Sequence, residues 1–280
     1  MRLSALWCRF LNSLFPKPVH PFNTQGDGMS YARWQYEKGL DTVKFFLPFT
    51  NPDEMFGGKT VLDIGCGAAG KTLFYAEHGV EKIYGLEVLE KYRGQAEDLA
   101  AQLGLSHLFE FVCADASKLP FPDNSTDTVI MNDAFEHVGN PEEVLKECLR
   151  VIKPGGRIFV NFPPYHHPFG AHLSDAIGIP WVHLLFSDKT LIEVYRDAVE
   201  KLPDGQERLD FRISRGDDGQ EYFSYINKMT VRRASEIVKK MGLRTVYHSE
   251  TALRPFLTPL TRLPVVKEAF VKMVTYIFEK

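Results

Sequence analysis

Short apolar segments alternate with amphipathic segments from Lys59 onward, and this alternation restricts the fold more than any other feature of the chain. The apolar segments predict five strands, at residues 60–65, 82–88, 109–116, 127–133 and 157–162, and the segments between them predict helices at 70–78, 91–103 and 141–152. Strands separated by helices pair in parallel through right-handed crossovers. The sequence therefore predicts an α/β fold with helices on both faces of a mostly parallel sheet, and ligands bind such sheets at the carboxyl ends of the strands.

The turn after the first predicted strand, DIGCGAAGKT from Asp63 to Thr72, fits three ligand-binding patterns. Its first and last glycines, followed by Lys-Thr, have the spacing of a phosphate loop, and its three glycines together have the spacing of a dinucleotide fingerprint. Asp63 with Gly65 and Gly67 also forms the D-x-G-x-G turn that binds S-adenosylmethionine. The turn alone leaves all three interpretations open.

Acidic residues at the ends of the predicted strands distinguish these interpretations. Glu87 lies about 20 residues beyond the glycines, where an acid accepts hydrogen bonds from both hydroxyls of a ribose. Asp115, followed by Ala116, suits a hydrogen bond with an adenine amino group. Asp63 places a carboxylate inside the turn, where it would repel a pyrophosphate but attract an ammonium or sulfonium group. The acids therefore favour S-adenosylmethionine.

The segments VLDIGCGAAG, YGLEV, CADASKLPFPDNSTDTVIMNDAFEHV and LRVIKPGGRIFV, in this order, resemble the successive motifs of class I S-adenosylmethionine-dependent methyltransferases. The resemblance covers about residues 59–162 and is greatest to the small-molecule group that includes quinone-biosynthesis enzymes. It implies a Rossmann-like sheet of seven mostly parallel strands and S-adenosylmethionine as cofactor. The residues that it implies for cofactor binding, with their immediate neighbours, are Asp63, Gly65, Cys66, Gly67, Glu87, Val88, Asp115, Ala116 and Asn132. The family's third glycine often stands where this chain has Ala69, so the helix start is expected to shift by a residue.

The rest of the chain completes this architecture. Residues 242–250 and 273–280 predict strands six and seven, and the family resemblance implies that the last strand is antiparallel. Residues 163–229 are too many for a loop and predict a lid insertion after strand five, over the substrate side. We therefore expect an N-terminal helical segment, 1–58, that covers the donor site, and a methyltransferase domain, 59–280, that contains the lid.

Four histidines are candidate general bases, because an imidazole can remove a proton from a hydroxyl near neutral pH. They are His166, His167 and His172 in the expected lid and His137 after strand four. The lid histidines could instead line or pack the lid, or bind a metal with Asp175 and His183. Adjacent histidines in an extended segment point to opposite sides, which is unlike a preformed metal site, and no metal is predicted.

Aromatic residues predict the character of the substrate pocket. The candidate substrate-binding residues are Tyr31, Trp34, Phe135, Tyr165 and Trp181. Tyr31 and Trp34 either fold over the donor or belong to ordinary core. A pocket of this composition suits a partly apolar or aromatic small molecule. The formal net charge of −3 gives no broad footprint for nucleic acid, which is not expected as a partner.

The first 18 residues contain apolar side chains at helical spacing, among them Leu3, Leu6, Trp7, Phe10 and Leu14. This stripe predicts a helix that either packs on the domain or lies in a membrane interface. Four scattered cysteines without a C-x-x-C pair are typical of a reducing cytoplasm, and no apolar run approaches the roughly 18 residues that span a bilayer. We expect a cytoplasmic protein with peripheral membrane contact as the open alternative.

The predicted function is S-adenosylmethionine-dependent methyl transfer to a hydroxyl of a small molecule, with nitrogen or carbon as less favoured acceptors. In-line displacement on a sulfonium depends strongly on alignment, so the enzyme does not strictly require a base. A non-catalytic donor-binding or membrane-associated accessory protein of the same fold is the alternative. A nicotinamide-binding oxidoreductase is less favoured.

Overall fold

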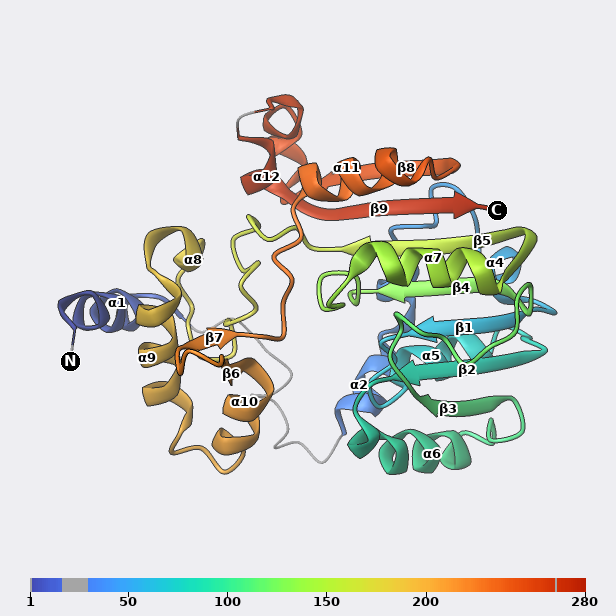
Figure 1. Cartoon of the computed structure of the whole chain (residues 1–280), viewed down its shortest axis with the longest axis horizontal. Helices are drawn as coiled ribbons and strands as arrows, with labels where there is room; N and C mark the ends of the chain where they lie inside the picture. Colours follow the sequence, from blue (N-terminus) through green and yellow to red (C-terminus); the bar gives the residue numbers. More distant parts are fainter. Residues whose placement is uncertain (1, 17–29, 265) are drawn as a thin grey trace. The chain divides into compact units, whose positions relative to one another are not determined.

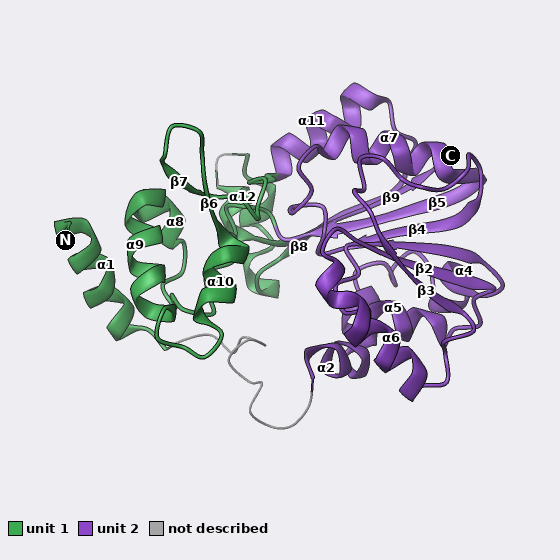
Figure 2. Cartoon of the chain, turned by 60° about the horizontal axis from the view of Figure 1, so that its bottom comes forward, with its two compact units in different colours: residues 1–26, 164–230, 252–272 green, residues 27–163, 231–251, 273–280 purple. Residues whose placement is uncertain are grey.

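The computed structural model describes residues 2–16, 30–264 and 266–280 and divides the chain into two compact units (Figures 1 and 2). Unit 1 contains residues 1–26, 164–230 and 252–272, and unit 2 contains 27–163, 231–251 and 273–280. The expected insertion, 163–229, thus falls almost wholly in unit 1, and the expected N-terminal segment, 1–58, is shared between the units. That the insertion acts as a lid stays a prediction.

A seven-stranded sheet with the order β3-β2-β1-β4-β5-β9-β8 forms the centre of unit 2 (Figure 1). Its strands are β1 (Thr60–Ile64), β2 (Lys82–Glu87), β3 (Phe109–Cys113), β4 (Thr126–Asn132), β5 (Ile152–Phe162), β8 (Thr245–Ala252) and β9 (Val271–Glu279). The pairs among β1 to β5 are parallel, and β9 runs antiparallel to β5. The predicted Rossmann-like sheet with an antiparallel last strand is confirmed. Strand order reverses between β1 and β4, where ligands bind in such folds.

Helices cover both faces of this sheet, with α5 and α6 on one face and α7 and α11 on the other (Figures 1 and 2). Their bounds are α5 Gly70–Ala76, α6 Arg93–Gln102, α7 Pro141–Val151 and α11 Val231–Met241, and α2 Tyr31–Glu37, α3 Gly39–Val43 and α4 Pro52–Phe56 precede β1. Helix α7 begins with Pro141 at its first position and an Asn140 cap that accepts from the Glu143 N–H at 3.4 Å. The core between sheet and helices is apolar, with Phe46, Phe56 and Phe159 fully buried.

Three boundaries differ from the sequence predictions. Strand β5 begins at Ile152 rather than Arg157, because the expected KPGG turn continues the strand across a register shift opposite Thr126 and Thr128. The helix expected from Lys91 starts as a 3₁₀ turn, η2 (Glu90–Tyr92), before α6. The charged segment 210–222 has the sequence of a solvated hairpin, but the hairpin starts only at Ile213, because the first residues of the segment form the end of α10 (Gly205–Arg212).

Unit 1 contains mainly helices around a small hairpin. Its elements are α1 (Leu3–Leu14), α8 (Val182–Leu185), α9 (Asp188–Val199), α10, the antiparallel pair β6 (Ile213–Arg215) and β7 (Glu221–Phe223), η3 (Pro255–Leu257), η4 (Leu260–Arg262) and α12 (Lys267–Phe270). The carboxylate of Asp175, considered above as a metal ligand, is buried between Arg208 and Arg212 and accepts from the Tyr195 hydroxyl at 2.7 Å. Asp175 is therefore part of a buried ion-pair network. None of the helices within the described residues has the length and apolar character needed to cross a bilayer.

Candidate functional site

The glycine turn between β1 and α5 is built by left-handed backbone conformations. Gly65 has φ +79°, Gly67 has φ +53° and Ala69, the N-cap of α5, has φ +60°. A Cβ on Gly65 would lie 2.7 Å from the Cβ of Ala134, whereas a Cβ on Gly67 would meet nothing within 4 Å. Gly65 is thus required by packing, and Gly67 leaves open space that a ligand can occupy. Helix α5 starts at Gly70, and Ala69 adopts the left-handed conformation that glycine ordinarily supplies.

The Glu87 carboxylate at the end of β2 is held by three backbone N–H groups. Its Oε2 accepts from Gly67 at 3.1 Å, and its Oε1 accepts from Val88 at 2.9 Å and from Leu89 at 3.1 Å. These bonds tie the end of β2 to the glycine turn. A carboxylate oxygen accepts more than one hydrogen bond, so the oriented group retains lone pairs for ribose hydroxyls.

Asp63 lies at the end of β1 and is almost completely buried. The Thr72 hydroxyl donates to its Oδ2 at 2.5 Å. Burial raises the pKa of Asp63 to about 7, although the bond from Thr72 and the charge of Lys71 act in the opposite direction. A buried carboxylate of this kind gains from a bound cation, because the cation stabilises its ionised form.

Asn132 ends β4 with an orphaned polar atom. Its Nδ2 donates to the Thr42 carbonyl at 3.0 Å and to the Tyr75 hydroxyl at 2.9 Å, which fixes the orientation of the amide. Its Oδ1 is buried and has no hydrogen-bond partner within the described residues. Buried oxygens of this kind ordinarily have a donor, and an ammonium group would supply one.

The remaining predicted cofactor residues lie around the same strand ends. Asp115 is exposed and accepts from the Ser117 N–H at 2.8 Å, and Ala116 is buried. Val88 is 64% exposed, which leaves its side chain available to a ligand. The Cys66 side chain instead belongs to the core, and burial raises the pKa of its thiol well above the ordinary value. Only the backbone of Cys66 remains as a candidate for donor contact.

These residues fit S-adenosylmethionine. The buried Asn132 Oδ1 and the Asp63 carboxylate suit the donor's ammonium and sulfonium groups, and Glu87 suits its ribose. The open space at Gly67 admits the donor close to the backbone. The donor would supply an activated methyl group at this site.

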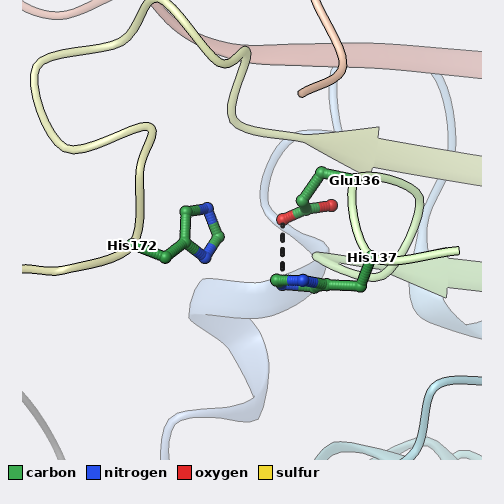
Figure 3. Close-up of side chains that lie close together, drawn as sticks. All are labelled: Glu136, His137 and His172. Carbon is green, nitrogen blue, oxygen red and sulfur yellow. Dashed lines mark ion pairs between the residues drawn. The ribbon is translucent and has the colours of Figure 1, made fainter. Parts of the chain in front are cut away.

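Two acids that follow β4, Asp133 and Glu136, were not among the predicted site residues. The Lys71 ammonium contacts the Asp133 carboxylate at 2.9 Å, and this charge outweighs the cost of burial and raises the pKa of Lys71. Glu136 is 1% exposed, and burial raises the pKa of its carboxyl well above the ordinary value. Figure 3 shows its Oε1 facing the Nε2 of His137, at 3.8 Å. The sequence FEHV, in which an acid directly precedes His137, was the signal that could have identified Glu136.

The predicted substrate-binding aromatics of unit 2 occupy two places. Tyr31 and Trp34 stack on helix α2, with ring centroids 6.0 Å apart, and α2 packs on α5. Burial raises the pKa of the Tyr31 hydroxyl, which lies near Lys71. Phe135 is buried after β4 and packs on Phe162 at the end of β5, at 5.5 Å. Tyr165 and Trp181 belong to unit 1.

His166, His167 and His172 of the predicted lid lie in turns of unit 1, where an extended segment was expected. The His166 Nδ1 pairs with the Glu268 carboxylate at 3.1 Å. The His167 Nδ1 accepts from the Phe169 N–H at 3.2 Å, and burial lowers the pKa of this imidazole to about 4. His172 has the left-handed φ of +52°. His166 and His167 therefore both use Nδ1, but toward a carboxylate in the first case and toward a backbone N–H in the second.

Comparison with known proteins agrees with the geometry of unit 2. Residues 62–160 match the family model described as a methyltransferase domain. The segment 62–160 is a methyltransferase domain, as the sequence resemblance predicted. A crystal structure of such a methyltransferase from Aquifex aeolicus shares the fold, with a TM-score of 0.50 at 18% identity over 93% of this chain and 98% of that one. S-adenosylmethionine is the cofactor that the family and the fold imply.

Three curated relatives resemble the methyltransferase domain. A sterol 24-C-methyltransferase of Gibberella zeae is 40% identical over 35% of this chain and 26% of its own length. A tocopherol O-methyltransferase of Arabidopsis thaliana is 34% identical over 41% of this chain and 33% of its own length. A phosphoethanolamine N-methyltransferase of the same plant is 30% identical over 44% of this chain and 24% of its own length. The chain thus matches about a quarter to a third of the length of these relatives. The closer resemblance to quinone-biosynthesis enzymes stays a prediction.

Proposed function

We propose that the protein transfers the methyl group of S-adenosylmethionine to a hydroxyl of a partly apolar or aromatic small molecule. The observation that carries the proposal is the donor constellation of unit 2. Glu87 is oriented by three N–H groups, Asn132 presents a buried oxygen, and Asp63 places a carboxylate within the turn. Groups fixed in this way hold a sulfonium in one orientation, and alignment supplies much of the rate enhancement of a displacement.

The apolar character of the acceptor is supported by two observations. The Phe135 and Phe162 rings pack together at the carboxyl ends of β4 and β5, the same edge of the sheet at which the donor residues lie. Two of the three relatives named above act on sterols or tocopherol, which are lipids. The third acts on polar phosphoethanolamine, so the relatives favour a lipid acceptor without requiring one.

Two histidines suit the task of a base for a hydroxyl acceptor. His137 lies directly after β4 beside the buried Glu136, and His166 has a carboxylate at its Nδ1. A carboxylate at Nδ1 keeps the proton on that nitrogen and leaves Nε2 basic. His167 is less suited, since its Nδ1 accepts a hydrogen bond and its proton therefore lies on Nε2.

The proposal is tested by incubating the protein with methyl-labelled S-adenosylmethionine and a lipid extract. We expect label in an organic-phase product that mass spectrometry identifies as a methyl ether. The matched control is Glu87→Ala, which should lose product in proportion to donor occupancy. Replacement of His137 or His166 by Gln should then lower turnover by roughly 10²- to 10⁴-fold at the residue that acts as base, with donor affinity unchanged.

Other outcomes identify the alternatives. Donor binding without product from lipid or polar extracts would indicate a non-catalytic donor-binding protein. Label on carbon or nitrogen would contradict the hydroxyl acceptor. Tight binding of NAD or ATP, with no binding of S-adenosylmethionine, would contradict the methyl-transfer proposal as a whole.

A further inference from the structure

Helix α1 turns five of its large apolar side chains away from the rest of unit 1. Leu3, Leu6, Trp7, Phe10 and Leu14 are 72, 43, 56, 55 and 63% exposed. At 3.6 residues per turn these five positions fall within an arc of roughly 100° on the helix. The buried residues, Ala5 and Cys8, lie on the opposite side. The helix packs on the unit, as one alternative predicted, but through Ala5, Cys8 and Leu11 rather than through the five exposed apolar residues.

Polar contacts hold α1 in this orientation. The Asn12 side chain donates to the Ala176 carbonyl at 3.1 Å and accepts from the Gly178 N–H at 2.8 Å. The Ser4 hydroxyl bonds to the Thr190 hydroxyl at 2.9 Å, and Arg9 pairs with Glu193 and Asp197 of α9. These contacts come from three successive turns of the helix. Rotating the apolar stripe inward would break all of them, so the stripe remains on the outside.

The segment that contains α1 is basic in its own sequence, although the chain has a formal net charge of −3. No Asp or Glu precedes Asp27, and of the two arginines at α1 only Arg9 is paired within the described residues, with Glu193 and Asp197 of α9. Arg2 is exposed next to Leu3. A basic segment with an apolar face is attracted to anionic lipid headgroups, and a tryptophan on that face suits the boundary between headgroups and acyl chains.

The size of the face favours a membrane over a protein partner. Five partly exposed side chains on one twelve-residue helix offer on the order of a few hundred Å², below the ~800 Å² per partner of a stable protein interface. Insertion into lipid has no such lower limit, because each apolar side chain contributes separately. We propose that α1 docks the protein on anionic membrane, with Leu3, Leu6, Trp7, Phe10 and Leu14 inserted into the headgroup boundary. This docking is independent of the methyl-transfer proposal.

The test is flotation of the whole protein with phosphatidylcholine vesicles, with and without phosphatidylglycerol. We expect binding to vesicles that contain phosphatidylglycerol and weaker binding at high salt. Trp7→Ser/Phe10→Ser should lower the partition constant roughly 10- to 100-fold. The matched control is Leu40→Ser, which removes a 61% exposed leucine from α3 in unit 2 and should bind like the parent. Urea unfolding should be unchanged in both variants, since the replaced side chains are largely exposed.

Two results would overturn the proposal: a parent that fails to float, and a Trp7→Ser/Phe10→Ser variant that floats like the parent. If the parent fails to float, sediments as a dimer and becomes monomeric on the double substitution, the face belongs to a second copy. None of these results bears on donor binding, so the methyl-transfer proposal is tested separately.

Discussion

The Glu87 carboxylate meets two demands at once, because it closes the glycine turn and faces the expected ribose. Its three backbone donors are bound at 2.9 to 3.1 Å. We expect Glu87→Ala to weaken S-adenosylmethionine binding by about 2 to 3 kcal/mol, as charge-assisted hydrogen bonds to both hydroxyls are lost together. Calorimetry measures this loss. Glu87→Gln is the matched control and should lose less, since its amide oxygen still accepts; unchanged affinity in Glu87→Ala would place the ribose elsewhere.

Asp63 makes donor binding depend on pH. Burial raises the pKa of this carboxyl to about 7 in the free protein, and a bound cation favours its ionised form. Binding therefore releases a proton below pH 7, so donor affinity should rise with pH, by at most about tenfold per unit, and level off above about 7. Calorimetry in buffers of different ionisation enthalpy measures the released proton. Asp63→Asn should bind more weakly and release no proton at this position; an identical pH profile would exclude the coupling.

At the scale of the element, the two glycines of the turn between β1 and α5 have different roles: Gly65 is needed for packing, and Gly67 leaves space for a ligand. A Cβ on Gly65 would lie 2.7 Å from the Cβ of Ala134, and the substituted residue would have to adopt a φ of +79°. A Cβ on Gly67 would meet no atom within 4 Å, and the neighbouring Ala69 shows that a residue with a Cβ is accommodated at φ +60°. The two glycines of one motif thus have different requirements.

We therefore expect Gly65→Ala to destabilise the fold by several kcal/mol and Gly67→Ala by only about 1 kcal/mol. Gly67→Ala should nevertheless weaken donor binding at least tenfold, because its methyl group enters the space of the ligand. Urea unfolding and donor titration of both variants give the comparison. Equal loss of stability in the two variants would contradict the distinction.

The sequence predicted those parts of the fold that local patterns determine. The strands that carry Asp63, Glu87 and Asn132 at or near their carboxyl ends follow from apolar runs in the sequence. The start of β5 was missed because KPGG has the composition of a turn, and the strand includes it because Ile152 and Arg157, on either side of it, both pair with β4. Glu136 was missed because the sequence places it beside a histidine but does not show that its side chain is buried. The direction of the α1 stripe depends on Asn12 and its partners at Ala176 and Gly178, which are distant in sequence.

At the scale of the whole molecule, the two units contain buried titratable groups with opposite pH dependence. In unit 1, burial lowers the pKa of both His167 and His183 to about 4, from an ordinary value of 6.5. In unit 2, burial raises the pKa of Asp63 from 3.8 to about 7. The native state thus binds fewer protons at the two histidines and one more at Asp63 than the unfolded chain binds over the same range.

The sign of each effect follows from linkage. The histidines contribute stability that is present above pH 6.5 and is lost as the pH falls towards 4, whereas Asp63 contributes stability that is present below 3.8 and is lost as the pH rises through about 7. Each shift corresponds to on the order of 3 kcal/mol. Within the range from pH 4 to 6.5 the two histidines oppose Asp63, and Glu136, whose pKa burial also raises, acts in the same direction as Asp63.

We therefore expect each substitution to change the pH dependence of unfolding of the donor-free protein in the direction that its own pKa shift sets. Asp63→Asn should lose more stability than the parent as the pH is lowered from about 6.5 to 4, because it removes a contribution that grows on acidification. His167→Gln/His183→Gln should lose less stability than the parent over the same range, because it removes two groups that favour the unfolded chain on acidification. Urea unfolding at a series of pH values measures all three proteins. If the double histidine variant lost stability on acidification as steeply as the parent, the buried imidazoles would not be the source of acid sensitivity.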